Sequence, residues 1–137
     1  MNGISAVLPA SSSGAIAARV LSLCVAIAAI SSLHYVTDPH RIVLHELYQY
    51  FYYLPIIVAA YWFGPIGGVL TATLASAGFV PHIRAVWVGN APYTVSQYGQ
   101  IVVFHLLGLG VGLLASAQRR RTDKYRETAV SLDLRNR

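Results

Sequence analysis

Long stretches without charge dominate the first 118 residues of this 137-residue chain. Only five charged side chains occur there, namely Arg19, Asp38, Arg41, Glu46 and Arg84. Charged residues form 11% of the whole sequence, whereas soluble domains carry ~25%. A chain with so few charges cannot cover a water-facing surface, so the sequence predicts an all-α integral membrane protein in contact with the lipid bilayer.

Four apolar segments predict a bundle of four transmembrane helices, since a spanning helix needs ~20 apolar residues. The third segment is short, and it either ends before Pro81 or continues past a kink there toward Trp87. The expected helices cover about 15–33, 39–63, 66–80 and 96–117. We expect an N-terminal arm, 1–14, before them and a basic tail, 118–137, after them.

Several local signals shape the second expected helix. Asp38 and Pro39 are typical of a helix N-cap and first helical position, and Gly64-Pro65 is typical of a helix end. Pro55 predicts a kink, because proline removes a backbone donor. An aromatic run predicts a membrane-interface belt, consisting of Tyr48, Tyr50, Phe51, Tyr52 and Tyr53.

The basic residues predict the orientation. Seven of the ten Lys and Arg residues lie between Arg119 and Arg137, and three acids accompany them, giving the tail a net charge of +4 (7 − 3). The positive-inside rule then places the C-terminus in the cytoplasm. We expect four of these residues at the membrane surface, namely Arg119, Arg120, Arg121 and Lys124. No recognition module accompanies the charge, so we expect no nucleic-acid partner.

Small residues recur at every fourth position in the last two expected helices. The two stripes are Gly68, Ala72 and Ser76, and Gly108, Gly112 and Ser116. Such stripes let helices approach closely in lipid. They predict packing within the chain, with contact to other membrane subunits or to a second copy in a homo-oligomer as alternatives.

The histidines are the main candidates for ligand or cofactor contacts. His34, His40, His45, His82 and His105 all fall in the outer half of the expected bundle, with Glu46 among them. Neutral imidazoles bind zinc, copper and haem-type rings, so a metal, a haem or a chlorophyll-type pigment could bind here. The spacing matches no metal motif, which leaves interfacial histidines bonded to neighbours and water as the alternative.

Two polar residues have separate explanations. His105 is the deepest histidine, and it either binds a ligand or pairs with Gln97, Tyr98 or Gln100. For Glu46 the sequence favours a local ion pair or hydrogen bond over a proton relay, because Arg41 lies within reach. The absence of acids from the central layers argues against a pump or a proton-coupled transporter.

The chain lacks the motifs of an enzyme. It contains no Gly-x-Ser-x-Gly, no phosphate-binding glycine loop and no catalytic cysteine with partners. We therefore expect no catalytic residues and no enzymatic activity.

The stretch 45–64, which begins His45-Glu46-Leu47 and contains Tyr53-Leu54-Pro55, is followed by Gly67-Gly68 and later by Pro81-His82. Together with the arginine-rich exit, it resembles the membrane-embedded input region of bacterial sensor histidine kinases over about residues 41–126. The resemblance implies a helical sensor in the bacterial cytoplasmic membrane, here without the kinase domains.

Two functions follow as hypotheses. The first is a non-catalytic accessory subunit of a larger membrane complex, either bioenergetic or pigment-carrying, which the small-residue stripes and missing catalytic groups motivate. The alternative is a sensory input module that detects a ligand or a metal through the outer histidines.

Overall fold

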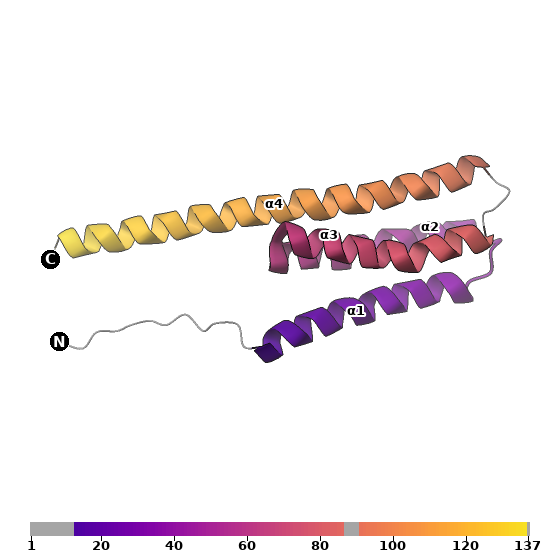
Figure 1. Cartoon of the computed structure of the whole chain (residues 1–137), viewed down its shortest axis with the longest axis horizontal. Helices are drawn as coiled ribbons and strands as arrows, with labels where there is room; N and C mark the ends of the chain where they lie inside the picture. Colours follow the sequence, from indigo (N-terminus) through magenta and orange to yellow (C-terminus); the bar gives the residue numbers. More distant parts are fainter. Residues whose placement is uncertain (1–12, 87–90, 137) are drawn as a thin grey trace.

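All elements in the described part of the chain are α-helices, which confirms the predicted all-α class there. The computed structural model describes residues 13–86 and 91–136. The helices are α1 (Ser13–Val36), α2 (Ile42–Phe51), α3 (Tyr53–Val86) and α4 (Ala91–Arg135), shown in Figure 1. Most of the expected N-terminal arm, and Trp87, lie outside the described residues, whereas Ser13 and Gly14 belong to α1.

Three helical stretches in this part of the chain are long and apolar enough to cross a membrane. They are Ser13–Val36, Ile42–Val86 and Tyr93–Arg135. The second stretch joins α2 to α3 and contains 45 residues. At ~1.5 Å per residue a straight helix of that length would be roughly 68 Å long, about twice the hydrocarbon thickness.

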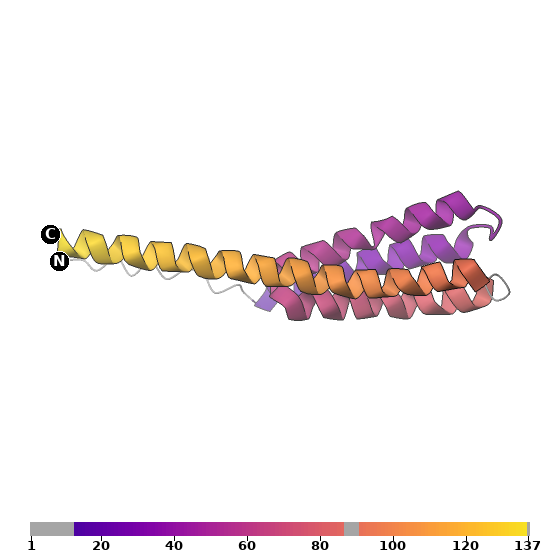
Figure 2. The same ribbon diagram turned by 90° about the horizontal axis from the view of Figure 1, so that it is seen from above.

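Gly64 divides this long stretch into two limbs, 42–63 and 65–86. Its backbone angles (φ 73°, ψ −160°) are not helical, and they lie in a region that only glycine adopts without steric strain. Pro65 follows directly and cannot donate a backbone hydrogen bond. The Gly64-Pro65 pair therefore reverses the chain direction, and Figure 2 shows the two limbs diverging from this end, with α4 in front of them.

Contacts between the limbs confirm that they are antiparallel. The ring centroids of Tyr52 and Phe79 lie 5.9 Å apart, and those of His45 and His82 lie 4.9 Å apart. The molecule therefore has two ends. We call the end with loop 37–41 the loop end, and the end with Gly64 and the projecting part of α4 the tail end.

The predicted start of the second helix is wrong in detail. The N-cap is Arg41, and α2 begins at Ile42 rather than at Pro39. Asp38 instead stabilises a turn, in which its Oδ1 accepts a hydrogen bond from the His40 amide (2.9 Å) and its carbonyl accepts one from the Arg41 amide (3.0 Å).

Only the hydrogen bonding is irregular near Pro55: α2 ends at Phe51 and α3 begins at Tyr53, while Tyr52 between them keeps helical backbone angles (φ −62°, ψ −24°). Pro55 has no N–H to donate to the Phe51 carbonyl, so the regular ladder fails in the preceding turn. The second limb continues through Pro81 to Val86, which answers the question left open for the third expected helix.

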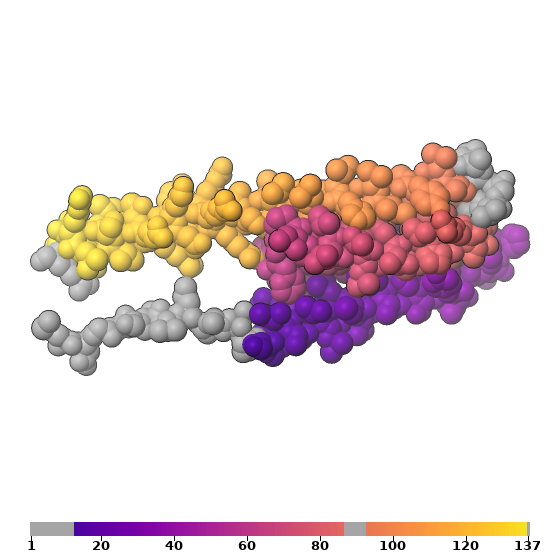
Figure 3. Space-filling model, viewed as in Figure 1, coloured from indigo at the N-terminus to yellow at the C-terminus, as the bar shows by residue number. Residues whose placement is uncertain are grey.

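The basic tail continues α4 without a break. The helix has 45 residues, and its last part projects beyond the other helices (Figures 1 and 3). The sequence contains no glycine or proline after Gly112, so nothing interrupts the helix as it leaves the bundle. All side chains from Arg119 to Asn136 are exposed.

Glycines bring α3 and α4 into backbone contact. A Cβ placed on Gly108 would lie 2.6 Å from the Gly68 carbonyl oxygen, and one placed on Gly112 would collide with Pro65. Ala72 is fully buried, Ser76 is 7% exposed, and Ser116 lies near Gly64. The small-residue stripes are therefore occupied within the chain.

A ring-rich core lies between the helices. Its fully or almost fully buried members include Tyr52, Ile56, Phe79, Ile83 and Phe104. Tyr52 is therefore a core residue and not part of an interfacial belt, whereas Tyr50 is exposed.

Candidate ligand site: a buried imidazole cluster

Three histidines from three helices meet at the loop end. His34 lies near the end of α1, His45 near the start of α2, and His82 near the end of α3. The ring centroids are 5.8 Å apart for His34 and His45, 5.3 Å for His34 and His82, and 4.9 Å for His45 and His82. All three are buried, at 1%, 4% and 2% exposure. We call these three residues the imidazole cluster.

Hydrogen bonds to backbone carbonyls set the protonation of two of the rings. His34 Nδ1 donates to the Ile30 carbonyl (3.1 Å), and His45 Nε2 donates to the Asp38 carbonyl (3.2 Å). In a neutral imidazole one nitrogen is a donor and the other is an acceptor. The acceptor nitrogens are then His34 Nε2 and His45 Nδ1.

Two ring nitrogens of the cluster are buried without a hydrogen-bond partner in the described part of the chain. They are His34 Nε2 and His82 Nε2. The great majority of buried polar atoms in proteins have a hydrogen-bond partner, so each atom without one requires an explanation. Metal-binding histidines commonly donate their second nitrogen to a backbone carbonyl, as His34 does.

Aromatic rings enclose the cluster. The His34 ring contacts Tyr48, Tyr52 and Phe79 at centroid distances of 5.7, 5.6 and 5.4 Å. Tyr52 is fixed by a 2.8 Å hydrogen bond between its hydroxyl and that of Ser31 on α1. Sequence reasoning missed this role of Tyr52, although His45, Gln49, Tyr52 and Ile56 recur at helical spacing on one face.

The cluster is not a preformed metal cage. Among the described residues, no three His, Cys, Asp or Glu side chains are placed so that they could hold a metal ion as they stand. The ring spacing nevertheless suits one ion, because three imidazoles bound to a tetrahedral ion at ~2.1 Å hold their centroids about 5 Å apart. It leaves no room between the rings for a porphyrin or chlorin macrocycle.

Two other predicted contacts at the loop end lie outside the cluster. His40 is exposed in loop 37–41. Glu46 is exposed on α2, and its Oε1 accepts a hydrogen bond from the Tyr93 hydroxyl of α4 (3.1 Å), so its partner is Tyr93 rather than Arg41.

His105 is paired far from the cluster. Its Nδ1 donates to the Ile101 carbonyl (2.8 Å), and its Nε2 lies 3.1 Å from the Thr73 hydroxyl of α3. The partner is thus Thr73 and none of the three residues expected. The Thr73 hydroxyl also lies 3.0 Å from the Val69 carbonyl, and its single proton can serve only one of these two acceptors at a time. When the hydroxyl donates to Nε2, His105 joins α3 to α4.

Arg119 holds α4 at the tail end against the hairpin that the two limbs, 42–63 and 65–86, form. Its guanidinium donates to the carbonyls of Tyr61 and Trp62, in the last turn before Gly64, and lies 5.6 Å from the Tyr61 ring centroid. Arg19 of α1 stacks over the Trp62 ring at 5.4 Å. The predicted surface residues Arg120, Arg121 and Lys124 are exposed on projecting α4.

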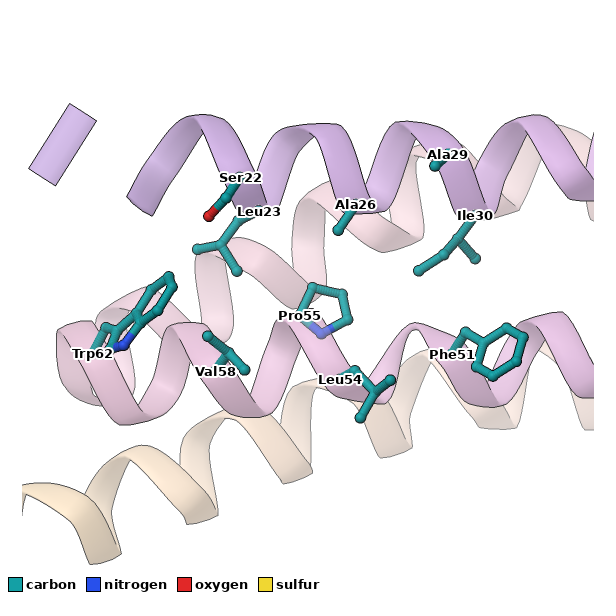
Figure 4. Close-up of a pocket in the computed structure, with 10 residues that line it drawn as sticks. All are labelled: Ser22, Leu23, Ala26, Ala29, Ile30, Phe51, Leu54, Pro55, Val58 and Trp62. Carbon is teal, nitrogen blue, oxygen red and sulfur yellow. The ribbon is translucent and has the colours of Figure 1, made fainter. Parts of the chain in front are cut away.

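An apolar groove separates α1 from the first limb. Figure 4 shows Leu23, Ala26 and Ile30 of α1 facing Pro55, Val58 and Trp62 across a space of about 460 Å³. The lining is almost entirely hydrocarbon, so the groove suits an acyl chain or an apolar helix and not a polar ligand.

Comparison with known proteins gives no relative. No family model matches the chain, and neither a curated protein nor a solved structure matches it. The similarity to sensor-kinase input regions therefore stays a prediction.

Proposed function

We propose that this chain is a membrane-embedded recognition module, which binds a small ligand at the imidazole cluster and passes the event to α4. The observation that carries the proposal is the burial of three imidazoles from three helices in one place. His34 Nε2 and His82 Nε2 are buried there without a hydrogen-bond partner among the described residues, which is unfavourable for folding alone, so a ligand-binding role explains these two nitrogens better. The resemblance to sensor-kinase input regions supports the same function.

The proposal that the chain spans a membrane rests on comparing the length of each helical limb with the thickness of a bilayer. Each limb has about 22 residues, or roughly 33 Å at ~1.5 Å per residue, which matches the ~30 Å of a bilayer core. With α1 and α4, four segments then cross the bacterial cytoplasmic membrane. The positive-inside rule, applied to the basic projection of α4, favours a cytoplasmic tail end and an imidazole cluster near the outer face.

A transition-metal dication is the ligand that the cluster suits best. Imidazole nitrogens are preferred ligands of Zn²⁺, Cu²⁺ and Ni²⁺, and the spacing of the rings accommodates a single ion. Binding requires small rotations of the rings, so that His34 Nε2, His45 Nδ1 and one nitrogen of His82 face a common point. No acid belongs to the cluster, so a bound dication keeps its charge inside the protein unless an anion or hydroxide accompanies it.

Metal titration of the full-length protein tests this proposal. The purified, metal-free chain in detergent micelles is titrated with Co²⁺ and Zn²⁺, followed by calorimetry and by the visible absorption of tetrahedral Co²⁺. We expect one ion per chain. His82→Gln should weaken binding by more than about 100-fold, exceeding the ~10–100-fold effect of changes outside the ligand shell.

The matched control is His105→Gln, which also replaces a membrane-embedded histidine but lies outside the cluster. It should leave the affinity and the Co²⁺ spectrum unchanged. Equal losses in the two variants, or no saturable binding by the unmodified chain, would refute the metal proposal.

The accessory-subunit hypothesis is a second candidate, which the apolar groove between α1 and the first limb favours. A partner helix seated there would cover side chains that are otherwise left to lipid. Val58→Trp would fill the groove, whereas Leu54→Trp points a bulky ring to its rim. Purification of the native assembly tests this function: a partner lost only in the Val58 variant supports it, and a chain that purifies alone contradicts it.

A further inference from the structure

A groove of about 680 Å³ opens at the tail end, where α4 leaves the other helices. Tyr61 of α3 forms one wall, and α4 forms the other with Leu114, Arg119 and Arg126. We propose that this groove is a binding site for one anionic phospholipid. The inference rests on the membrane-spanning part of the proposed function and is independent of the imidazole cluster.

The groove is apolar at one end and basic at the other, as a lipid with acyl chains and an anionic headgroup requires. Its Leu114 end is apolar, and Leu114 itself is 73% exposed. About one turn further on, Arg119 begins the basic projection, and Arg126 follows two turns later. The groove therefore runs from hydrocarbon depth to headgroup depth, so that acyl chains can lie on Leu114 while the phosphate reaches the arginines.

Arg119 is already fixed in position. Its two terminal nitrogens donate to the Tyr61 and Trp62 carbonyls, and its plane is held near the Tyr61 ring. A guanidinium carries five N–H donors, and three of those of Arg119 point to the two carbonyls, so two remain for a phosphate oxygen. An arginine held in place loses less conformational entropy on binding than a free one.

Arg126 lies on the same face of α4, because seven residues bring the helix round to within about 20°. Asp123 also lines the groove, but no ion pair joins it to Arg119 or Arg126 in the described part of the chain. The groove thus has a net charge of +1 (2 − 1). Arg121 carries the same charge but lies about 200° round the helix from Arg119, away from the groove.

Quenching by brominated lipids tests the site in reconstituted, full-length protein. Tyr61→Trp serves as the reporter, with Trp62→Phe and Trp87→Phe removing the other two indoles. The vesicles mix phosphatidylglycerol with phosphatidylcholine, and the bromines are carried by one lipid at a time. The ratio of the two quenching curves gives the local preference of the groove for the anionic lipid.

We expect a preference of about fivefold or more for phosphatidylglycerol, because each basic residue at an anionic surface contributes about that factor. Arg126→Gln should reduce the preference about fivefold, and Arg121→Gln should leave it unchanged. Arg126 is exposed and makes no contact with the core, so its replacement does not threaten the fold. An unchanged circular dichroism spectrum checks this.

Three results would overturn the inference. Equal losses in Arg126→Gln and Arg121→Gln would mean general attraction of a basic helix to a charged surface. Removal of the preference by excess inorganic phosphate would mean a free-anion site rather than a lipid site. No preference in the reporter protein that keeps both arginines would mean no site at all. None of these outcomes depends on metal binding at the loop end.

Discussion

Replacing Gly108 by alanine tests the packing that joins α4 to the hairpin. A Cβ at Gly108 would lie 2.6 Å from the carbonyl oxygen, 2.7 Å from the carbonyl carbon and 3.2 Å from the Cα of Gly68. All three are backbone atoms, so no side chain can rotate to make room. Ordinary contact begins at about 3.4 Å, so the two helices must separate by nearly 1 Å.

The magnitude follows from this separation. Overpacking of a tight site costs about 1–3 kcal/mol, and a gap of 0.5–1 Å forfeits roughly a quarter to a half of each dispersion contact. Helices in lipid associate mainly through such contacts. We therefore expect a loss near 3 kcal/mol from the contact between α3 and α4, offset by up to about 1 kcal/mol of improved helix propensity.

Gly110→Ala is the matched control. It lies on the same helix two residues further on, and an added Cβ meets nothing within 4 Å. The propensity gain is common to both variants and cancels in the comparison. Reversible unfolding in mixed micelles, followed by circular dichroism, should place Gly108→Ala about 3 kcal/mol below Gly110→Ala. Equal unfolding free energies would refute the reasoning.

Three further predictions use the same unfolding measurement. Gly64→Ala should lose about 1–3 kcal/mol, because its backbone conformation (φ 73°) suits only glycine; an unchanged midpoint would contradict this. Tyr52→Phe should lower the unfolding free energy by about 1 kcal/mol, because it removes the hydrogen bond to Ser31. The double variant with Ser31→Ala should be only slightly less stable than Tyr52→Phe alone, and fully additive losses would show that this bond does not contribute. Thr73→Val should lose about 0.5–1.5 kcal/mol, the net contribution of one hydrogen bond, and an unchanged unfolding free energy would show that the contact with His105 does not stabilise the protein.

The helical class and the main chain reversal could be predicted from the sequence because each depends on local chemistry. Apolar length alone identifies the helices. Gly64-Pro65 combines a residue that tolerates positive φ with one that cannot donate, so the reversal follows from two adjacent side chains. The predicted start of α2 was wrong because the same local chemistry has two outcomes. Asp38 can cap either a helix or a turn, and here it caps the turn of loop 37–41.

The composition of the imidazole cluster could not be predicted from spacing. His34, His45 and His82 are separated by 11 and 37 positions, so only the antiparallel packing of α1, α2 and α3 brings them together. The same packing excludes His105, which the sequence distinguishes only by its depth in the last expected helix. Its partner, Thr73, is 32 residues away on a neighbouring helix, so the pair becomes visible only once the register of α3 against α4 is known.

The proposed sensory role requires that the cluster and α4 share contacts, and the aromatic core supplies them. His34 contacts Tyr52 and Phe79, and both of these rings contact Phe104 of α4, at 5.7 and 6.3 Å. A ligand changes the position of α4 only if it favours one packing of these rings over another. Since α4 is a continuous helix from Phe104 to the basic projection, a displacement at Phe104 is carried to the tail end without crossing a joint. The three rings, and not the arginines, are therefore where a signal from the cluster would first reach α4.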